Sequence, residues 1–206
     1  MLAPHCTVTI VAPDQERSAV GHGITMHQPL RATPVSIDNS RHWMVNGTPS
    51  DCIKLAVEHL LKDQPPGLII SGINRGPNFG NDILYSGTVA AALEGSIYQL
   101  PSIAASLASY GKADFNPAAT FIRAHLLKLK ELAAHATLNL NFPVSHAEHA
   151  PFAGYKFTRL GKRSYHNVFE ERQDPRGQSY YWMAGEPAVF DQAFDSDIKA
   201  VEEGYI

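Results

Sequence analysis

Residues 71–88 read SGINRGPNFGNDILYSGT, and a short apolar run, LII, precedes them at residues 68–70. The apolar run predicts a strand inside a parallel sheet, and the glycines, asparagines and proline that follow predict that the chain turns at Asn74. Glycine permits positive φ and close backbone approach, while Asn74, Asn78 and Asn81 offer amide groups without bulk. Because open α/β sheets bind ligands beyond the carboxyl ends of their strands, we expect an anion-binding loop at this position.

A helix of small side chains follows this loop at residues 88–95. Ser86 is the expected N-cap, which leaves the amides of Gly87, Thr88 and Val89 at the positive end of the helix. A phosphate group fits such a position. The alternative is that Ser86 is only a cap and the asparagines are only turn residues. The combination of loop and helix favours the phosphate site.

Strands and helices alternate along most of the chain. Strands are expected at residues 7–11, 101–106 and 137–142, and a helix at residues 117–134. Another helix begins after residue 48, where a threonine cap, a proline and an aspartate follow the pattern of a capping box. This alternation predicts an α/β fold.

The alternation stops at Pro143. Residues 155–160 and 179–183 are rich in aromatic side chains and are expected to form the two arms of a long hairpin, with a turn at residues 174–177. An aromatic projection of this kind favours a subunit contact over an active site. We therefore expect a core at residues 1–143 and an extended hairpin region, used for oligomerisation, at residues 144–206.

Composition limits the classes of partner. The chain has 206 residues, 44% of them hydrophobic, a formal net charge of -3 and a pI near 6.3. These values argue against a nucleic-acid polymer or an anionic membrane as the main partner and leave a small phosphorylated ligand open. Two cysteines are too few for a disulfide scaffold, which favours a reducing cytoplasm. The sequence has no apolar run of membrane-spanning length and no signal-peptide pattern, so we expect a soluble protein.

Four blocks of sequence together resemble the signature blocks of the SurE survival-protein phosphatases. The blocks read APDQERS at residues 12–18, NGTPSDC at 46–52, SGINRGPN at 71–78 and YSGTVAAALEG at 85–95. The shorter segments EER, DPRG and AVEEGY follow in the order of the family at residues 170–172, 174–177 and 200–205. The likeness thus covers nearly the whole chain.

The resemblance implies a metal-dependent 5'/3'-nucleotidase that hydrolyses nucleoside monophosphates and, in some members, short polyphosphate. It implies a Rossmann-like, three-layer, doubly wound and mostly parallel sheet, and a homo-oligomer, a dimer or tetramer, built through extended arms. The metal-binding serine and asparagine of the family fall on Ser18 and Asn74, where one Mg²⁺ or Mn²⁺ ion per subunit would take neutral oxygen ligands. The phosphoryl group would lie against four residues: Asn78, Ser86, Gly87 and Thr88. A metal-activated water would attack phosphorus.

Two differences from the family pattern open an alternative. Family members begin with a strand that ends in two adjacent aspartates, whereas this sequence begins at Met1 with what resembles the second strand, and it ends at Ile206 where relatives continue. We therefore expect a chain without the first strand and the C-terminal elements, in which the catalytic residues are unknown. The alternative function is a noncatalytic protein that binds nucleotide or phosphate. A dinucleotide-dependent oxidoreductase is the weaker third option, because the Gly-x-Gly-x-x-Gly fingerprint is missing.

Several polar residues receive no site role from the sequence. The pairs His22 with His27 and His146 with His149 lack a third soft ligand nearby, so we assign them no metal. Asp51 is explained by helix capping, with a direct catalytic role as the minor possibility. Glu94 is either solvent-facing or linked to the site loop, and the sequence does not distinguish these two positions.

Overall fold

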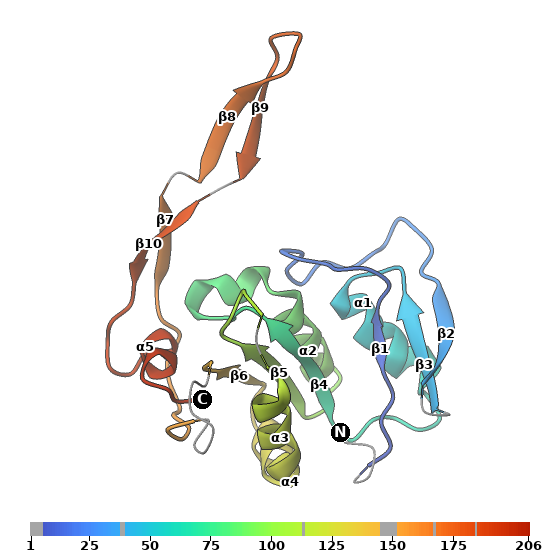
Figure 1. Ribbon diagram of the computed structural model, residues 1–206. Helices are drawn as coiled ribbons and strands as arrows, with labels where there is room; N and C mark the ends of the chain where they lie inside the picture. The colour runs from blue at the N-terminus through green and yellow to red at the C-terminus, as the bar shows by residue number, and fades with distance from the viewer. Residues whose placement is uncertain (1–5, 38–39, 113, 145–151, 167, 184) are drawn as a thin grey trace.

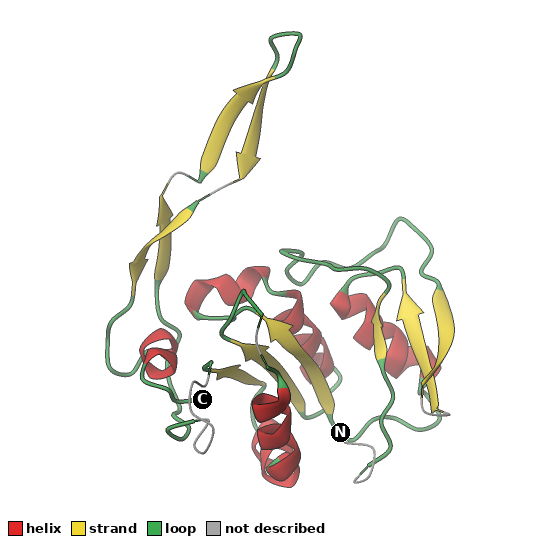
Figure 2. Cartoon of the chain, in the orientation of Figure 1, coloured by secondary structure: helices red, strands yellow, loops and turns green. Residues whose placement is uncertain are grey.

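The chain folds into a mixed α/β body from which a β-ribbon arm projects (Figures 1 and 2). The computed structural model describes residues 6–37, 40–112, 114–144, 152–166, 168–183 and 185–206. In these ranges, the body contains two three-stranded sheets, in the orders β1-β3-β2 and β4-β5-β6.

The sheet β4-β5-β6 forms the centre of the body. Its strands β4 (Ile69–Arg75), β5 (Ser102–Leu107) and β6 (Leu138–Phe142) are parallel, and every residue of β5 is buried. Successive side chains of a strand point to opposite faces. Accordingly, Ala104 packs with helix α2 (Gly87–Ile97), while Ile103 and Leu107 pack with helices α3 (Asn116–Ala124) and α4 (Leu126–Ala133). Helices therefore cover both faces of this sheet.

The second sheet is mixed. Strand β1 (Val11–Pro13) pairs in parallel with β3 (Ser40–Val45), which pairs antiparallel with β2 (Ala32–Ile37). Helix α1 (Pro49–Leu55), followed by the π-helical turn η1 (Ala56–Leu60), contacts both β1 and α2. The α1–α2 contact thus joins the two sheets.

The arm consists of two antiparallel strand pairs, β7 with β10 and β8 with β9 (Figure 1). Their bounds are Arg163–His166 for β7, Phe169–Gln173 for β8, Ser179–Met183 for β9 and Glu186–Phe190 for β10. The expected turn at residues 174–177 joins β8 to β9, and the Asp174 carboxylate accepts hydrogen bonds from the amides of Arg176 and Gln178. The prediction that residues 155–160 form the other arm of the hairpin is wrong, because the tight turn at residues 174–177 pairs β9 with β8.

The chain returns from the arm to the body through helix α5 (Asp197–Glu202). Phe152 and the C-terminal Ile206 pack against the core cluster on the α3–α4 side of the central sheet. Among the described residues, none of the helices has the length and apolar content needed to cross a membrane.

Three further expectations about local structure are corrected. The chain does not turn at Asn74, because β4 continues to Arg75 with an irregularity between Ser71 and Asn74. The first strand begins at Val11 instead of residue 7, since that is where pairing with β3 starts. The helix expected at residues 117–134 is interrupted at His125, whose φ of -110° and ψ of 15° are not helical.

Candidate functional site

Ser86 caps helix α2 as the sequence predicts. Its backbone is extended, with φ -79° and ψ 117°, and its hydroxyl accepts a hydrogen bond of 3.1 Å from the amide of Val89. The amides of Gly87 and Thr88 lie in the first turn, where an α-helix offers no intrahelical acceptor. Together with the helix dipole, these two amides form a position suited to an anion.

We expect Ser86→Ala to lower the free energy of unfolding by about 1 kcal/mol, because the Val89 amide loses its acceptor at a buried helix end. Ser86→Gly is the matched control and is expected to cost a few tenths of a kcal/mol. Chemical denaturation of both variants, followed by circular dichroism, measures the difference. No loss of stability in Ser86→Ala would mean that the hydroxyl does not stabilise the helix end.

The loop after β1 lies against the start of α2. The amide of Gly21 donates to the carbonyl of Tyr85 over 3.0 Å. A Cβ on Gly87 would lie 3.2 Å from Val20 Cγ2 and 2.9 Å from Pro49 Cγ, so both residues press on the same point. Val20 follows the first signature block, Pro49 lies in the second and Gly87 in the fourth. These three parts of the chain therefore meet at Gly87.

A capping box fixes the start of α1 and ties it to the same loop. Thr48 Oγ1 accepts from the Asp51 amide over 3.1 Å and donates to the carbonyl of Gly23 over 2.7 Å. The Asp51 carboxylate, whose residue is 2% exposed, accepts from the Thr48 amide and from both the amide and the hydroxyl of Thr25. Burial alone would raise the pKa of Asp51, but the bonds from Thr25 and Thr48 outweigh it and hold the pKa below its usual 3.8. The geometry gives Asp51 a structural role.

Glu94 is linked to the loop after β1, which rules out the solvent-facing position that the sequence left open. The residue is 4% exposed, and its carboxylate lies 2.8 Å from His22 Nε2 and 3.6 Å from Lys54 Nζ. The pairing of His22 with Glu94 spans 72 residues of sequence, and no local pattern points to it. This contact holds the loop over α2.

Asn74 and Asn78 lie near one another at the carboxyl end of the central sheet. Asn74 pairs in register with Ser106 of β5, and its side-chain amide donates to the carbonyl of Gly76. The buried Asn78 side chain donates to the Ser106 hydroxyl, and its backbone exchanges hydrogen bonds with Asn141. Asn139 also donates to the Asn78 carbonyl. The asparagine side chains of β6 therefore support this loop.

Ser18 lies in the loop after β1, and its hydroxyl donates to Glu16 over 3.4 Å. In the described ranges, no group of three or more His, Cys, Asp or Glu side chains is arranged to hold a metal ion. The oxygens of Ser18 and Asn74 are hard but neutral, and a divalent ion usually also takes carboxylate ligands. These two residues alone do not fit a complete divalent-metal site.

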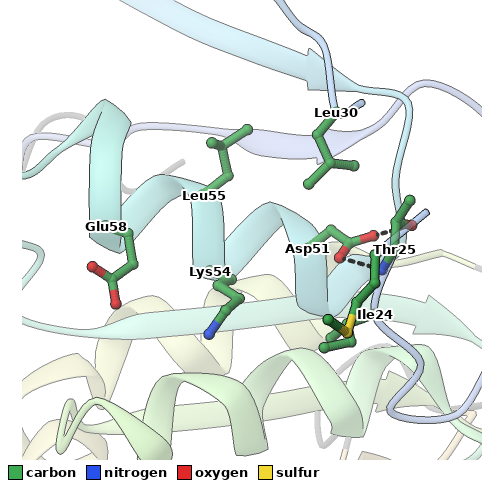
Figure 3. A pocket seen from close by; sticks show the side chains of 8 residues that line it. Ile24, Thr25, Leu30, Asp51, Lys54, Leu55 and Glu58 are labelled. Atoms are coloured by element: carbon green, nitrogen blue, oxygen red, sulfur yellow. Dashed lines mark hydrogen bonds between the residues drawn. The ribbon is translucent and has the colours of Figure 1, made fainter. Parts of the chain in front are cut away.

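A groove of about 350 Å³ lies between α1 and the segment that follows the loop after β1 (Figure 3). It is mostly apolar, and the Asp51–Thr25 hydrogen bonds lie at one end of it. Its lining residues are Ile24, Thr25, Met26, Leu30, Asp51, Lys54, Leu55 and Glu58. None of the six residues predicted for metal or phosphate binding lines this groove.

Comparison with known proteins identifies relatives along almost the whole chain. The family described as "Survival protein SurE" matches residues 1–167. The "5'-nucleotidase SurE" of Heliobacterium modesticaldum is 52% identical over 97% of this chain and 74% of its own length, and that of Alkaliphilus metalliredigens is 49% identical over 97% and 79%. A crystal structure of the SurE protein from Aquifex aeolicus is 34% identical, with a TM-score of 0.78 over 99% of this chain and 82% of that chain.

Proposed function

The chain belongs to the SurE family, and from this membership we propose that it is a nucleotidase that hydrolyses nucleoside monophosphates. Family membership implies nucleotide phosphomonoesterase activity. The observation that carries the proposal is the meeting of the loop after β1, the start of α1 and the capped start of α2 at Gly87. Activity on 5' and 3' esters, and on short polyphosphate, extends this proposal.

In this proposal the phosphoryl group binds at the first turn of α2. The amides of Gly87 and Thr88 donate to its oxygens, and the hydroxyl of Thr88 adds a further donor. The Ser86 hydroxyl stabilises the helix end by accepting a hydrogen bond from the Val89 amide. Asn78 holds the loop through hydrogen bonds to Ser106 of β5 and Asn141 of β6. Oriented donors of this kind stabilise the charge that develops during phosphoryl transfer.

SurE nucleotidases depend on a divalent metal. We assign Ser18 and Asn74 as two neutral ligands of one Mg²⁺ or Mn²⁺ ion per subunit, which agrees with the preference of these ions for oxygen. The described residues do not complete such a site. In this proposal, the chain's own residues bind and orient the phosphoryl group.

A second function, binding of nucleotide or phosphate without hydrolysis, is favoured by one observation. In the described part of the chain, no group of three or more His, Cys, Asp or Glu side chains is arranged to hold a metal ion. The amide donors at the start of α2 do not depend on such a group, so the second function predicts binding without hydrolysis.

The test uses Thr88→Asp, which places a negative charge where the phosphate would bind and where a helix start tolerates an acid well. We expect at least about tenfold weaker binding of a nucleoside monophosphate, measured by titration calorimetry, with no loss of thermal stability. Thr88→Ser, which keeps the hydroxyl, is the control and should bind like the natural chain.

Phosphate release with Mn²⁺, compared with release in EDTA, separates the two functions. Metal-stimulated release by the natural chain supports the nucleotidase, and binding without release supports the second function. If Thr88→Asp binds the nucleoside monophosphate as well as the natural chain does, the start of α2 is not the phosphate site in either proposed function.

We further propose a Rossmann-like, three-layer, doubly wound arrangement in which β1-β3-β2 and β4-β5-β6 share the middle layer. The contact of α1 with α2, and of each helix with one of the sheets, supports it. We propose residues 1–143 as the core and residues 144–206 as the arm region. Five exposed side chains on the hairpin β8–β9, namely Phe169, Tyr180, Tyr181, Trp182 and Met183, support an oligomer contact there.

A further inference from the structure

The short 3₁₀ helix η2 (Gly80–Tyr85) joins Asn78 to Ser86 and is held by residues from the far end of the chain. The Asp197 carboxylate, on a residue that is 8% exposed, accepts from the Gly80 amide over 2.7 Å. Its other oxygen accepts from the amides of Gly161 and Ile198 over 2.8 Å each. One buried carboxylate thus joins the start of η2, the segment before β7 and the start of α5.

A second set of contacts reaches the middle of η2 from β7. Arg163 Nη1 lies 2.7 Å from the Asp82 carboxylate, and the Tyr165 hydroxyl donates to the same carboxylate. The backbone amide of Arg163 also donates to Asn81 Oδ1 over 2.8 Å. The Arg163 and Asp82 side chains are 7% and 19% exposed, so the ion pair is largely shielded from water. Burial and the bond to Asp82 raise the pKa of Tyr165 to about 12, which keeps the hydroxyl a donor.

The two segments also pack backbone to backbone. Gly80 has φ +49°, and a Cβ there would overlap the carbonyl oxygen of Gly161. Glycine is required at this point because it permits both the positive φ and the close approach. The base of the arm therefore lies directly on η2.

We propose that Arg163 and Tyr165 are positioning residues of the phosphate site, which hold η2 through Asp82 and thereby fix the turn at Ser86–Thr88. The connection is short, because the amide of Ser86 donates to the carbonyl of Ile83 within η2 and the Ser86 hydroxyl then caps α2. Both residues act through other groups, without contact to the substrate. Their effect on phosphate binding rests on the proposed function, whereas their effect on η2 does not.

The first measurement is hydrogen exchange of the backbone amides in residues 80–89, followed by mass spectrometry on the full chain. Arg163→Ala breaks a shielded ion pair and leaves, among the described side chains, the Tyr165 hydroxyl on Asp82, so local opening of η2 should become easier. We expect exchange in this segment to accelerate at least about tenfold. Arg172→Ala is the matched control, since the Arg172–Glu170 pair lies on the hairpin β8–β9 with both side chains 54% exposed. It should leave this segment unchanged.

Tyr165→Phe guards against a general loss of fold, because it removes only the hydroxyl. We expect faster exchange in residues 80–89 for this variant too, by a smaller factor, with the exchange of β5 unchanged. Both variants should also bind inorganic phosphate and a nucleoside monophosphate more weakly than Arg172→Ala does. Exchange in residues 80–89 that matches the Arg172→Ala control would overturn the proposal. If the natural chain binds neither ligand, the proposed function fails, while the exchange measurement still decides whether Arg163 and Tyr165 hold η2.

Discussion

Replacing Gly72 with alanine is expected to lower the free energy of unfolding by about 3 kcal/mol. Gly72 has φ +114°, and a Cβ there would overlap the carbonyl oxygen of Ala105 on the neighbouring strand β5. The variant therefore combines an unfavourable backbone conformation with a clash against a fixed backbone atom. Chemical denaturation of the natural chain and the variant, followed by circular dichroism, measures the loss.

Gly177→Ala separates the two contributions. Gly177 also has a positive φ, of +80°, but a Cβ there would have no neighbour within 4 Å. Its replacement should cost about 1 kcal/mol, from the backbone conformation alone. If the two variants lose equal stability, the close approach of β4 to β5 at Gly72 is not important.

Gly72 also explains why the sequence predicts a turn where the structure has a strand. A cluster of glycine and asparagine signals that regular structure is disturbed, and it does so for turns and for β-bulges alike. In this sheet the register shifts between Ser71 and Asn74, and β4 then resumes its pairing with β5. Whether such a cluster forms a turn or a bulge depends on the neighbouring strand, here β5, which pairs with β4 on both sides of the irregularity.

Local features are predicted well because neighbouring residues determine them. The N-caps at Thr48 and Ser86 depend on a side chain and an amide three residues away, and both are present. The strand partner of Ser179–Met183 is an exception, because it is the adjacent strand β8 across the turn at residues 174–177 and the sequence still predicts it wrongly. In helix α2, Leu93 and Ile97 are exposed, whereas Val89 and the alanines at residues 90–92 are buried and form the packed face.

The candidate site shows the same division. The sequence points to the loop and to the capped helix, because both are continuous stretches with recognisable chemistry. It does not reveal the contacts of Glu94 with His22, of Asn78 with Asn141 or of Asp82 with Arg163, which span 72, 63 and 81 residues. Such contacts carry no local pattern, so a single sequence cannot predict them.

Asp51→Ala is expected to lower the free energy of unfolding by about 3 kcal/mol. The carboxylate is the acceptor for three donors, the amide and hydroxyl of Thr25 and the amide of Thr48, at a residue that is 2% exposed. Its removal leaves these partly buried donors without that acceptor and loosens the loop from the start of α1. Asp63→Asn, at an exposed position, is the control and should change the stability by less than about 0.5 kcal/mol.

The dependence on pH tests the same carboxylate more sharply. Because the hydrogen bonds lower the pKa of Asp51 in the folded state below 3.8, its stabilisation is fully present above that value and is lost as the pH falls through the lowered pKa. The stability difference between the natural chain and Asp51→Asn should therefore be constant from pH 7 to about pH 5 and shrink towards pH 3. Denaturant titrations at each pH measure it. A difference that stays constant down to pH 3 would show that the hydrogen bonds do not favour the charged form, and the structural role assigned to Asp51 would then be wrong.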